Sequence, residues 1–399
     1  MKILVIDEEF PYPLNSGKRI RTFHLTRYLA DHHDVSYLAY GSSDSAAADS
    51  LREHRITPYA VVPVDRSQQG IRFYLRLALN LFSRYPYVVT SHYTPAFQSR
   101  LERLIAEQQF DLVVCEWTPY AIFLRRLDNV RSIIVAHNIE SEIWRRYQEN
   151  ETNPLKRWYI SIQRAKVERF ERNCFEWADG ATTVSEPEAE TLRGSGITAP
   201  VAVIENGVDV DYFQPGREVV DDHMLVFTGS MDWRPNQDAA IFFVREIFPL
   251  LRREQPRLTA VFVGRRPPRK VLELADTEGI VVTGTVDDVR PYIARAGVYI
   301  VPLRIGGGSR LKILEAMAMG KAVVSTSVGA EGLRVEDGVD ILLGDTPQQF
   351  TRQVIDCLND EKRRQTLAER GRQLVQKHYR WEQLGERYHR FLMSVAGKS

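Results

Sequence analysis

Short apolar segments alternate with longer stretches of helical periodicity through most of this 399-residue chain. Such alternation predicts parallel sheets whose strands are joined by covering helices. The pattern runs twice, and it restarts after residues 206–222. These residues show little periodicity and contain Pro215 and Gly216, so we predict that they form the linker and hinge between the two halves. The length also suits roughly two domains of about 200 residues each. We therefore predict an α/β fold of two Rossmann-like, doubly wound domains facing each other across a cleft, at 1–205 and 206–379.

The predicted strands are the short apolar segments between helical patterns. In the first domain they are 2–6, 34–39, 112–115, 132–136, 181–184 and 201–204. In the second domain they are 224–228, 258–263, 280–283, 298–302 and 322–325. Residues from about 350 to 396 are predicted to be helical throughout. The last part, 380–399, is predicted to pack back on the first domain.

Composition and charge exclude several classes of protein. The 53 basic and 52 acidic residues give a net charge of +1, which does not favour nucleic acid as a partner. The three cysteines show no metal-ligand spacing and suit a reducing cytosol. The N-terminus lacks the apolar core of a signal peptide, and no run reaches the roughly 18 apolar residues that span a bilayer. We expect a cytoplasmic protein, in solution or on the inner face of the membrane.

The segment 306–320, GGGSRLKILEAMAMG, combines an anion cradle with a carboxylate. Its three glycines let the backbone approach a ligand, and a helix predicted to start near Ser309 would offer its first N–H groups to a diphosphate. Glu315 lies about two turns along that helix, where its carboxylate could reach sugar hydroxyls of the same ligand. Phosphate and sugar groups together indicate a nucleotide.

Loops that follow strands are the other candidates, because ligands bind at the carboxyl ends of parallel strands. The first loop, 10–19, has Gly17 beside a helix start, although a plain strand-to-helix turn explains it equally well. His137 follows the strand at 132–136 and could donate a hydrogen bond to a sugar or phosphate oxygen, but a structural histidine is the commoner case.

In the second domain, Gly229 permits close approach to phosphate, and Arg234 could supply a charged fork for it. The turn that contains Val286 could present backbone groups to a base. The fingerprints G-x-G-x-x-G after a first strand and G-x-x-x-x-G-K-[ST] are both absent, which argues against dinucleotide oxidoreductases and P-loop enzymes.

Three segments in this order resemble retaining glycosyltransferases of family four, which have the GT-B fold of two Rossmann-like domains. They are VIENGVD at 203–209 with Phe213, FTGSM at 227–231, and LEAMA at 314–318 with Gly320. The resemblance covers nearly the whole chain. It implies a hexosyltransferase whose second domain binds a nucleoside-diphosphate sugar and whose first domain presents a sugar or lipid-linked acceptor, in polysaccharide or glycolipid assembly.

The resemblance also implies roles for particular residues. Glu315 matches the glutamate that holds the ribose hydroxyls, His137 the histidine that contacts the transferred sugar, and Gly17 the glycine beside the donor phosphate and the acceptor. Val286 matches the residue whose backbone meets the base. The amides around Ser309, Arg310 and Leu311 match the diphosphate-binding helix start of the family. Gly229, Gly307 and Gly308 are further candidates for the donor site, because glycine permits close approach of the backbone.

Two positions depart from the family pattern. The family often has a glutamate eight positions before the one at Glu315, where this chain has Gly307. The usual Arg and Lys after the first strand of the second domain are also absent, because Ser230 and Pro235 or Asn236 fall there. Arg234, Arg310 or Lys312 could replace that charge, with Arg234 and Lys312 as the candidates for neutralising the leaving phosphate.

The family mechanism is transfer on one face of the sugar with retention, and the phosphate leaves as the acceptor hydroxyl approaches. It requires no protein nucleophile, and we expect no metal or other cofactor. Physically, the protein would stabilise the leaving diphosphate and orient the sugar.

Residues 71–100 contain four arginines, several aromatic residues and no acidic residue. This segment could rest on an anionic membrane and take a lipid-linked acceptor. A second basic, aromatic helix is predicted at about 155–177. The alternative is that both are amphipathic helices whose apolar sides pack on the sheet while their arginines are solvated.

Two other functions remain open from the sequence. An epimerase or hydrolase on the same paired domains would need acid and base groups around the sugar, and His137 alone is a poor set. A catalytically silent subunit that binds a nucleotide sugar is the second, and Gly307 keeps it open.

Overall fold

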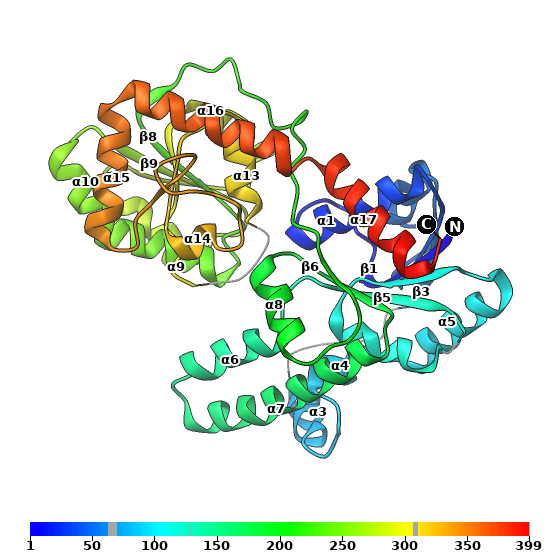
Figure 1. The fold of residues 1–399 in the computed structure, drawn as a ribbon. Coiled ribbons are helices and arrows are strands. Elements are labelled where there is room, and N and C mark those ends of the chain that lie inside the picture. Colours follow the sequence, from blue (N-terminus) through cyan, green and yellow to red (C-terminus); the bar gives the residue numbers. More distant parts are fainter. Residues whose placement is uncertain (63–69, 128, 306–309, 399) are drawn as a thin grey trace. The chain divides into compact units, whose positions relative to one another are not determined.

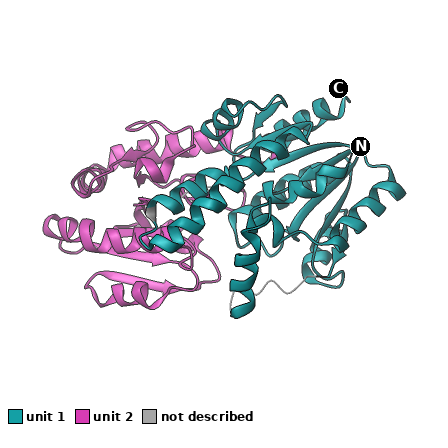
Figure 2. Cartoon of the chain, turned by 90° about the horizontal axis from the view of Figure 1, so that it is seen from below, with its two compact units in different colours: residues 1–205, 384–399 teal, residues 206–383 magenta. Residues whose placement is uncertain are grey.

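The computed structural model describes residues 1–62, 70–127, 129–305 and 310–398. These residues form two compact units (Figure 2). Unit 1 comprises 1–205 with 384–399, and unit 2 comprises 206–383. Each unit contains its own parallel sheet with helices packed on it (Figure 1). The predicted fold class, two doubly wound α/β domains, is confirmed.

Unit 1 is built on a seven-stranded sheet in the order β3-β2-β1-β4-β5-β6-β7. Its strands are β1 (Lys2–Glu9), β2 (Asp34–Tyr40), β3 (Ile56–Val61), β4 (Leu112–Cys115), β5 (Arg131–Ala136), β6 (Gly180–Thr183) and β7 (Val201–Val203). Its helices are α1 (Gly17–Ala30), α2 (Ala46–Glu53), α3 (Ile71–Asn80), α4 (Tyr87–Thr90), α5 (Pro95–Gln108), the 3₁₀ helix η1 (Thr118–Arg126), α6 (Glu140–Asn150), α7 (Pro154–Glu176) and α8 (Glu186–Gly194).

The first strand lies at the centre of this sheet because it is apolar on both faces. Ile3, Leu4, Val5 and Ile6 are all fully buried, as expected for a strand that helices cover on both sides. Strand β1 pairs in parallel with β2 and with β4, so the strand order reverses beside β1. A ligand site is expected at the carboxyl end of such a reversal.

Unit 2 repeats the design with a six-stranded sheet in the order β10-β9-β8-β11-β12-β13. Its strands are β8 (Asp221–Thr228), β9 (Thr259–Val263), β10 (Ile280–Gly284), β11 (Ala296–Val301), β12 (Val323–Ser325) and β13 (Leu342–Leu343). Its helices are α9 (Arg234–Phe242), the π-helical turn η2 (Phe243–Ile247), α10 (Phe248–Glu254), α11 (Arg269–Leu272), the 3₁₀ turn η3 (Glu273–Asp276), α12 (Arg290–Arg295), α13 (Leu311–Ala318), α14 (Ser327–Ala330), α15 (Pro347–Asn359) and α16 (Glu361–His378).

The last helix, α17 (Trp381–Ala396), continues the helical C-terminal region. From Leu384 onward it belongs to unit 1. Gly385 lies so close to the Tyr28 ring of α1 that a Cβ there would overlap the ring, and Phe391 and Val395 pack against Gly180. Glycine at position 385 therefore lets α17 approach α1 closely.

The segment 206–222, predicted as a linker, is instead part of unit 2. The Val208 amide donates to the Tyr379 carbonyl at 2.8 Å, and Val208 lies in the core of that unit. Phe213 packs against the same core, and β8 already begins at Asp221. The low periodicity of the segment reflects an irregular packed chain rather than an exposed linker.

Among the described helices, none is both long and apolar enough to cross a membrane.

Candidate active site

The carboxyl ends of β8 and β9 meet at two glycines. The Gly229 amide donates to the Val263 carbonyl at 2.9 Å, and a Cβ on Gly264 would overlap the Gly229 carbonyl. A Cβ on Gly229 would lie 2.7 Å from Lys312 Nζ and 2.8 Å from Asn236 Nδ2. Only glycine fits at either position without displacing its neighbours, so the loop after β8 packs directly against Lys312, Asn236 and the turn after β9.

Lys312 reaches this loop from α13. Its Nζ donates to Asn236 Oδ1 at 2.6 Å and lies 4.1 Å from the centre of the Phe227 ring. Burial lowers the pKa of Lys312 to about 7, although the Glu315 carboxylate favours its charged form. Pro235 or Asn236 stands at one of the two places where the family pattern has a cation, and Lys312 brings a cation to Asn236 from another element.

Glu315 lies one turn beyond Lys312 on the same helix. Burial raises the pKa of its carboxyl to about 7, with Lys312 acting in the opposite direction. Its side chain keeps part of its surface exposed. Hydroxyl donors of a ligand stabilise the ionised form of a carboxylate most when it is desolvated but still accessible.

A second cation reaches the same loop from the residue after Gly264. Arg265 Nε donates to Ser230 Oγ at 2.6 Å, and the Met231 amide donates to the Arg265 carbonyl at 2.9 Å. About a third of the Arg265 side chain is exposed, at 32%. Ser230 is the other position where the family pattern has a cation, so both neutral positions receive a cation from a neighbouring loop or helix.

The other two proposed replacement cations are placed differently. Arg310 is buried, and its guanidinium donates to the Glu331 carbonyl at 3.3 Å and to its carboxylate at 3.1 Å. Arg310 is thus held by Glu331. Arg234 starts α9 as an exposed residue, and it has no ion pair or side-chain hydrogen bond with the rest of the described chain.

The helix predicted to start near Ser309 begins at Leu311 instead. Arg310 adopts a left-handed conformation with φ of 49° directly before it, and this conformation cannot continue an α-helix. Leu311 is buried at the first helical position. The N–H groups of a first turn have no carbonyl four residues back to bond, and in α13 the Ile313 amide instead donates to the Arg310 carbonyl at 3.0 Å. Gly307, Gly308 and Ser309 lie outside the described residues.

Val286 follows β10, the edge strand of unit 2, and its side chain packs against the core. Gly284 ends β10 with φ of 73°, a conformation that favours glycine. The turn therefore points its one apolar side chain inward.

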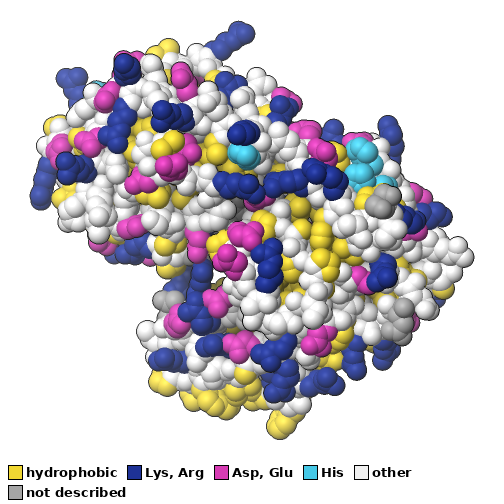
Figure 3. Space-filling view, in the orientation of Figure 1, with side chains coloured by type: hydrophobic (Ala, Val, Ile, Leu, Met, Phe, Trp, Pro, Cys, Tyr) yellow, Lys and Arg dark blue, Asp and Glu magenta, His cyan; other side chains and the backbone are white. Residues whose placement is uncertain are grey.

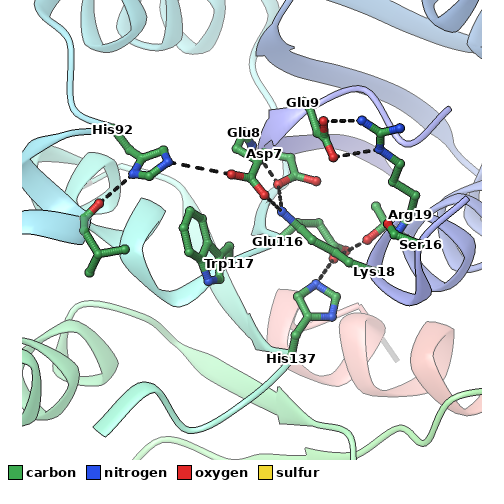
Figure 4. A network of polar contacts seen from close by, with 12 residues as sticks. Asp7, Glu8, Glu9, Ser16, Lys18, Arg19, His92, Glu116, Trp117 and His137 are labelled. Carbon is green, nitrogen blue, oxygen red and sulfur yellow. Dashed lines mark hydrogen bonds and ion pairs between the residues drawn. The ribbon is translucent and has the colours of Figure 1, made fainter. Parts of the chain in front are cut away.

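In unit 1, the carboxyl end of β1 and the start of α1 are joined by an ionic cluster (Figure 4). Lys18 Nζ donates to Asp7 Oδ1 at 2.6 Å and to Glu8 Oε1 at 2.8 Å. Burial alone would lower the pKa of Lys18, but the two carboxylates outweigh it and raise that pKa. Burial raises the pKa of Asp7 to about 7, despite Lys18. Gly17, the residue before Lys18, is the first of α1, and the Ser16 hydroxyl caps the helix.

His137 is part of the same region, directly after β5. Its Nε2 lies 3.0 Å from Glu116 Oε2, and the Thr22 hydroxyl donates to that oxygen at 3.0 Å (Figure 4). Burial lowers the pKa of His137 against the opposing effect of Glu116. A neutral ring that donates from Nε2 to Glu116 presents Nδ1 as an acceptor. Nε2 is therefore engaged by Glu116, which leaves Nδ1 as the ring nitrogen that could meet a ligand.

Sequence reasoning overlooked the polar residues that support these positions. They are Asp7, Lys18, Glu116, Asn236 and Arg265. Glu116 follows the predicted strand at 112–115 directly, and Asp7 follows the predicted first strand. The strand-end rule that selected His137 would therefore have selected both. Nothing in the sequence pairs Ser230 with Arg265, which are 35 positions apart.

Among the described residues, no group of three or more His, Cys, Asp and Glu side chains is arranged to hold a metal ion.

Two family models match the chain. The model described as Glycosyltransferase Family 4 covers residues 16–212, and the model described as Glycosyl transferases group 1 covers 222–360. A Klebsiella pneumoniae protein, called an uncharacterized 44.6 kDa protein in the cps region, is 22% identical over 95% of this chain and 96% of its own length. The lipopolysaccharide 1,2-N-acetylglucosaminetransferase of Salmonella typhimurium is 24% identical over 68% of this chain and 78% of its own length.

Solved structures resemble the whole chain at low identity. HepE of Anabaena in complex with UDP and glucose has a TM-score of 0.70 and 15% identity, over 99% of this chain and 100% of that one. Sucrose-phosphate synthase of Thermosynechococcus elongatus has a TM-score of 0.74 and 16% identity, over 100% of both chains. These likenesses establish the GT-B fold. Since the two family models account for most of both units, the chain belongs to the group 1 glycosyltransferases.

Proposed function

We propose that this glycosyltransferase moves a sugar from a nucleoside-diphosphate sugar to an acceptor hydroxyl, with retention of the anomeric configuration. The observation that carries the proposal is the convergence of Lys312 and Arg265 on the glycine-cleared loop after β8, with Glu315 one turn further along α13. Two cations on one glycine loop suit a diphosphate, and an adjacent carboxylate suits ribose hydroxyls. Structures of the similar protein HepE in complex with UDP and with UDP-glucose support the proposal.

The proposed reaction needs no protein nucleophile. The bond from the anomeric carbon to the diphosphate oxygen breaks with its electron pair going to the diphosphate. The acceptor oxygen then bonds to that carbon from the same face and gives its proton to the departing phosphate oxygen. Lys312, Arg265 and the first N–H groups of α13 would stabilise the leaving charge, which is where preorganised donors contribute most to a rate.

We assign the acceptor to unit 1, where His137, Glu116 and the cluster around Lys18 lie at strand ends. The relatives from a cps region and from lipopolysaccharide synthesis favour a cell-surface polysaccharide or glycolipid as the acceptor class. The first experiment is calorimetric titration of the purified chain with UDP, GDP, ADP and their common sugar conjugates, first in EDTA and then with magnesium. Selective binding to one base in EDTA supports the proposal, and no binding to any of them contradicts it.

A product assay tests retention. With the donor found by calorimetry and a panel of saccharide and lipid-linked acceptors, NMR of the product should show the anomeric configuration of the donor. An inverted product would contradict the one-face mechanism. Release of free sugar that does not depend on acceptor would support a hydrolase instead, and binding without turnover across the panel would support a silent subunit.

His137→Ala is expected to lower turnover about tenfold or more while the affinity for the free nucleoside diphosphate changes less than twofold, because the ring would contact only the sugar. Glu116→Gln, which keeps a hydrogen-bond acceptor for Nε2, should retain more activity than His137→Ala. Both variants are checked by thermal unfolding. Equal losses in turnover and nucleotide affinity would make His137 a structural residue.

Arg265→Ala is expected to weaken binding of the nucleoside diphosphate about fivefold, the order of one charged hydrogen bond near solvent. Arg269→Ala is the matched control, because Arg269 is an exposed arginine four positions later that pairs only with Glu273 on its own surface. Calorimetry measures both. An Arg265→Ala variant with the control's affinity would remove Arg265 from the donor site.

A further inference from the structure

The helix α3 presents its apolar face outward. Ile71, Leu75 and Leu79 follow a helical spacing, and their side chains are 77%, 57% and 70% exposed. Phe82, just beyond the helix, is 91% exposed. Scattered exposed apolar side chains are ordinary, but four large ones along one stripe indicate a surface that contacts something apolar.

Polar contacts on the opposite side hold α3 against unit 1. Asn80 is buried, and its side-chain amide donates to Thr90 Oγ1 at 2.9 Å and accepts from Gln163 Nε2 at 2.9 Å. Lys166 Nζ donates to the Asn80 carbonyl at 2.6 Å. An ordinary amphipathic helix would bury its leucines, so the alternative that the apolar side of this segment packs on the sheet is wrong for α3.

The start of α7 extends the apolar surface. Leu155 is 78% exposed and Trp158 is 55% exposed. In the space-filling view, hydrophobic side chains gather along the lower edge of unit 1, where α7 and α3 lie, with Lys and Arg side chains beside them (Figure 3). We call this surface the α3–α7 patch and define it by Ile71, Leu75, Leu79, Phe82, Leu155 and Trp158.

The two segments that form the patch carry charge of one sign. Residues 71–101 and 154–167 contain no Asp or Glu, although acidic and basic residues are balanced in the whole chain. Arg72, Arg84, Lys156 and Arg157 are exposed in these two segments. Basic side chains beside exposed leucine, phenylalanine and tryptophan are the combination that binds the interface of an anionic bilayer. A second protein copy with the same basic surface would be repelled.

We propose that the α3–α7 patch docks unit 1 on an anionic lipid membrane, with the six apolar side chains inserted among the acyl chains and the basic side chains on the headgroups. This docking goes beyond the proposed sugar transfer, since it uses none of the donor-site residues. Its consequence for the reaction is that acceptors carried on a lipid would be held near unit 1.

Flotation of the full chain with lipid vesicles tests the proposal. Binding is expected to vesicles of phosphatidylcholine with about 30% phosphatidylglycerol, a composition that gives a negative surface potential. It is expected to weaken several-fold in phosphatidylcholine alone and on raising the salt from about 0.05 M to about 0.5 M, because salt screens the headgroup charge. Absence of binding to the anionic vesicles in low salt would overturn the proposal.

Two double variants distinguish specific docking through the patch from nonspecific adsorption. Leu75→Glu with Leu79→Glu should lower the partition to anionic vesicles more than tenfold, because two apolar side chains are lost from the buried face. The matched control is Val219→Glu with Leu272→Glu, which are exposed apolar residues of unit 2 at 87% and 48%. Equal losses in the two double variants would contradict a specific docking surface.

The double variant Arg84→Gln with Arg157→Gln tests the contribution of the basic side chains. Its control, Arg217→Gln with Arg352→Gln, removes the same charge from exposed positions of unit 2. Only the first pair should weaken vesicle binding.

Light scattering reports self-association. A wild-type dimer that Leu75→Glu with Leu79→Glu abolishes, without vesicle binding, would make the patch an interface between copies and overturn membrane docking. Unchanged nucleotide affinity in the Leu75, Leu79 variant would show that the donor site is intact.

Discussion

Replacing Lys312 with methionine is expected to lower the turnover of sugar transfer about 100-fold, the usual size of the loss when one preorganised donor is removed from a developing negative charge. Methionine keeps an unbranched side chain of similar length but removes the cation beside Gly229 and over the Phe227 ring. Steady-state kinetics with the donor identified by calorimetry measures the effect. Lys362→Met, at an exposed lysine of α16, is the control and should keep wild-type turnover.

The pH dependence gives Lys312 a signature that a structural lysine would lack. Its pKa is about 7 in the folded protein, so the cation is lost as pH rises above 7. Affinity for the nucleoside-diphosphate sugar should then fall between pH 7 and 9, by at most about tenfold per pH unit. This fall should be absent in Lys312→Met.

Stability should change in the opposite direction over the same range. The ordinary pKa of lysine is 10.5, so between pH 7 and 10.5 the unfolded chain binds more protons at Lys312 than the folded chain does. The contribution of Lys312 to the free energy of unfolding therefore increases as pH rises through that range. Urea unfolding of wild type and Lys312→Met at several pH values measures the difference. A flat affinity between pH 7 and 9, or turnover in Lys312→Met close to wild type, would remove Lys312 from the reaction.

Glu315→Ala is expected to weaken binding of the nucleoside diphosphate by more than tenfold, about 1.4 kcal/mol, a modest value for lost hydrogen bonds to a charged group. The pKa of Glu315 is about 7, so wild-type affinity should also fall as pH drops below 7 and the carboxyl takes up a proton. Its ordinary pKa is 4.5, so the folded chain binds more protons than the unfolded chain between pH 4.5 and 7. The contribution of Glu315 to the free energy of unfolding therefore decreases as pH rises through that range.

Calorimetry with the nucleoside diphosphate and with the corresponding 2′-deoxynucleotide locates the contact. Loss of the ribose hydroxyl should cost wild type several-fold in affinity and cost Glu315→Ala less, because the carboxylate is then already missing. Glu369→Ala, at an exposed position of α16, is the matched control. A folded Glu315→Ala variant with unchanged affinity would contradict the assignment.

The fold could be predicted from the sequence except for one edge strand of each sheet. Strand β3 was missed because Pro58 interrupts it, and proline is tolerated there since β3 is an edge strand. Strand β13 was missed because it is two residues long and lies at the edge of the other sheet. Neither carries the continuous apolar run that marks the central strands, which are buried on both faces.

The segment 206–222 was wrongly predicted as a linker for a related reason. Periodicity reports regular structure, and a chain that packs without regular structure has none. Val208 is buried in the core of unit 2 through a single bridge to the end of α16, which the local sequence does not indicate.

The sequence by itself determined the two parallel sheets, the strand ends at which the polar residues gather, and the membership in a glycosyltransferase family, because buried parallel strands and glycine-rich turns leave local patterns. Only the tertiary structure decided which cations reach the loop after β8, that Arg310 is turned toward Glu331, that His137 is held by Glu116, and that α3 shows its leucines to the outside. These depend on contacts between residues distant in the chain, and side-chain direction across such distances follows from packing rather than from local pattern.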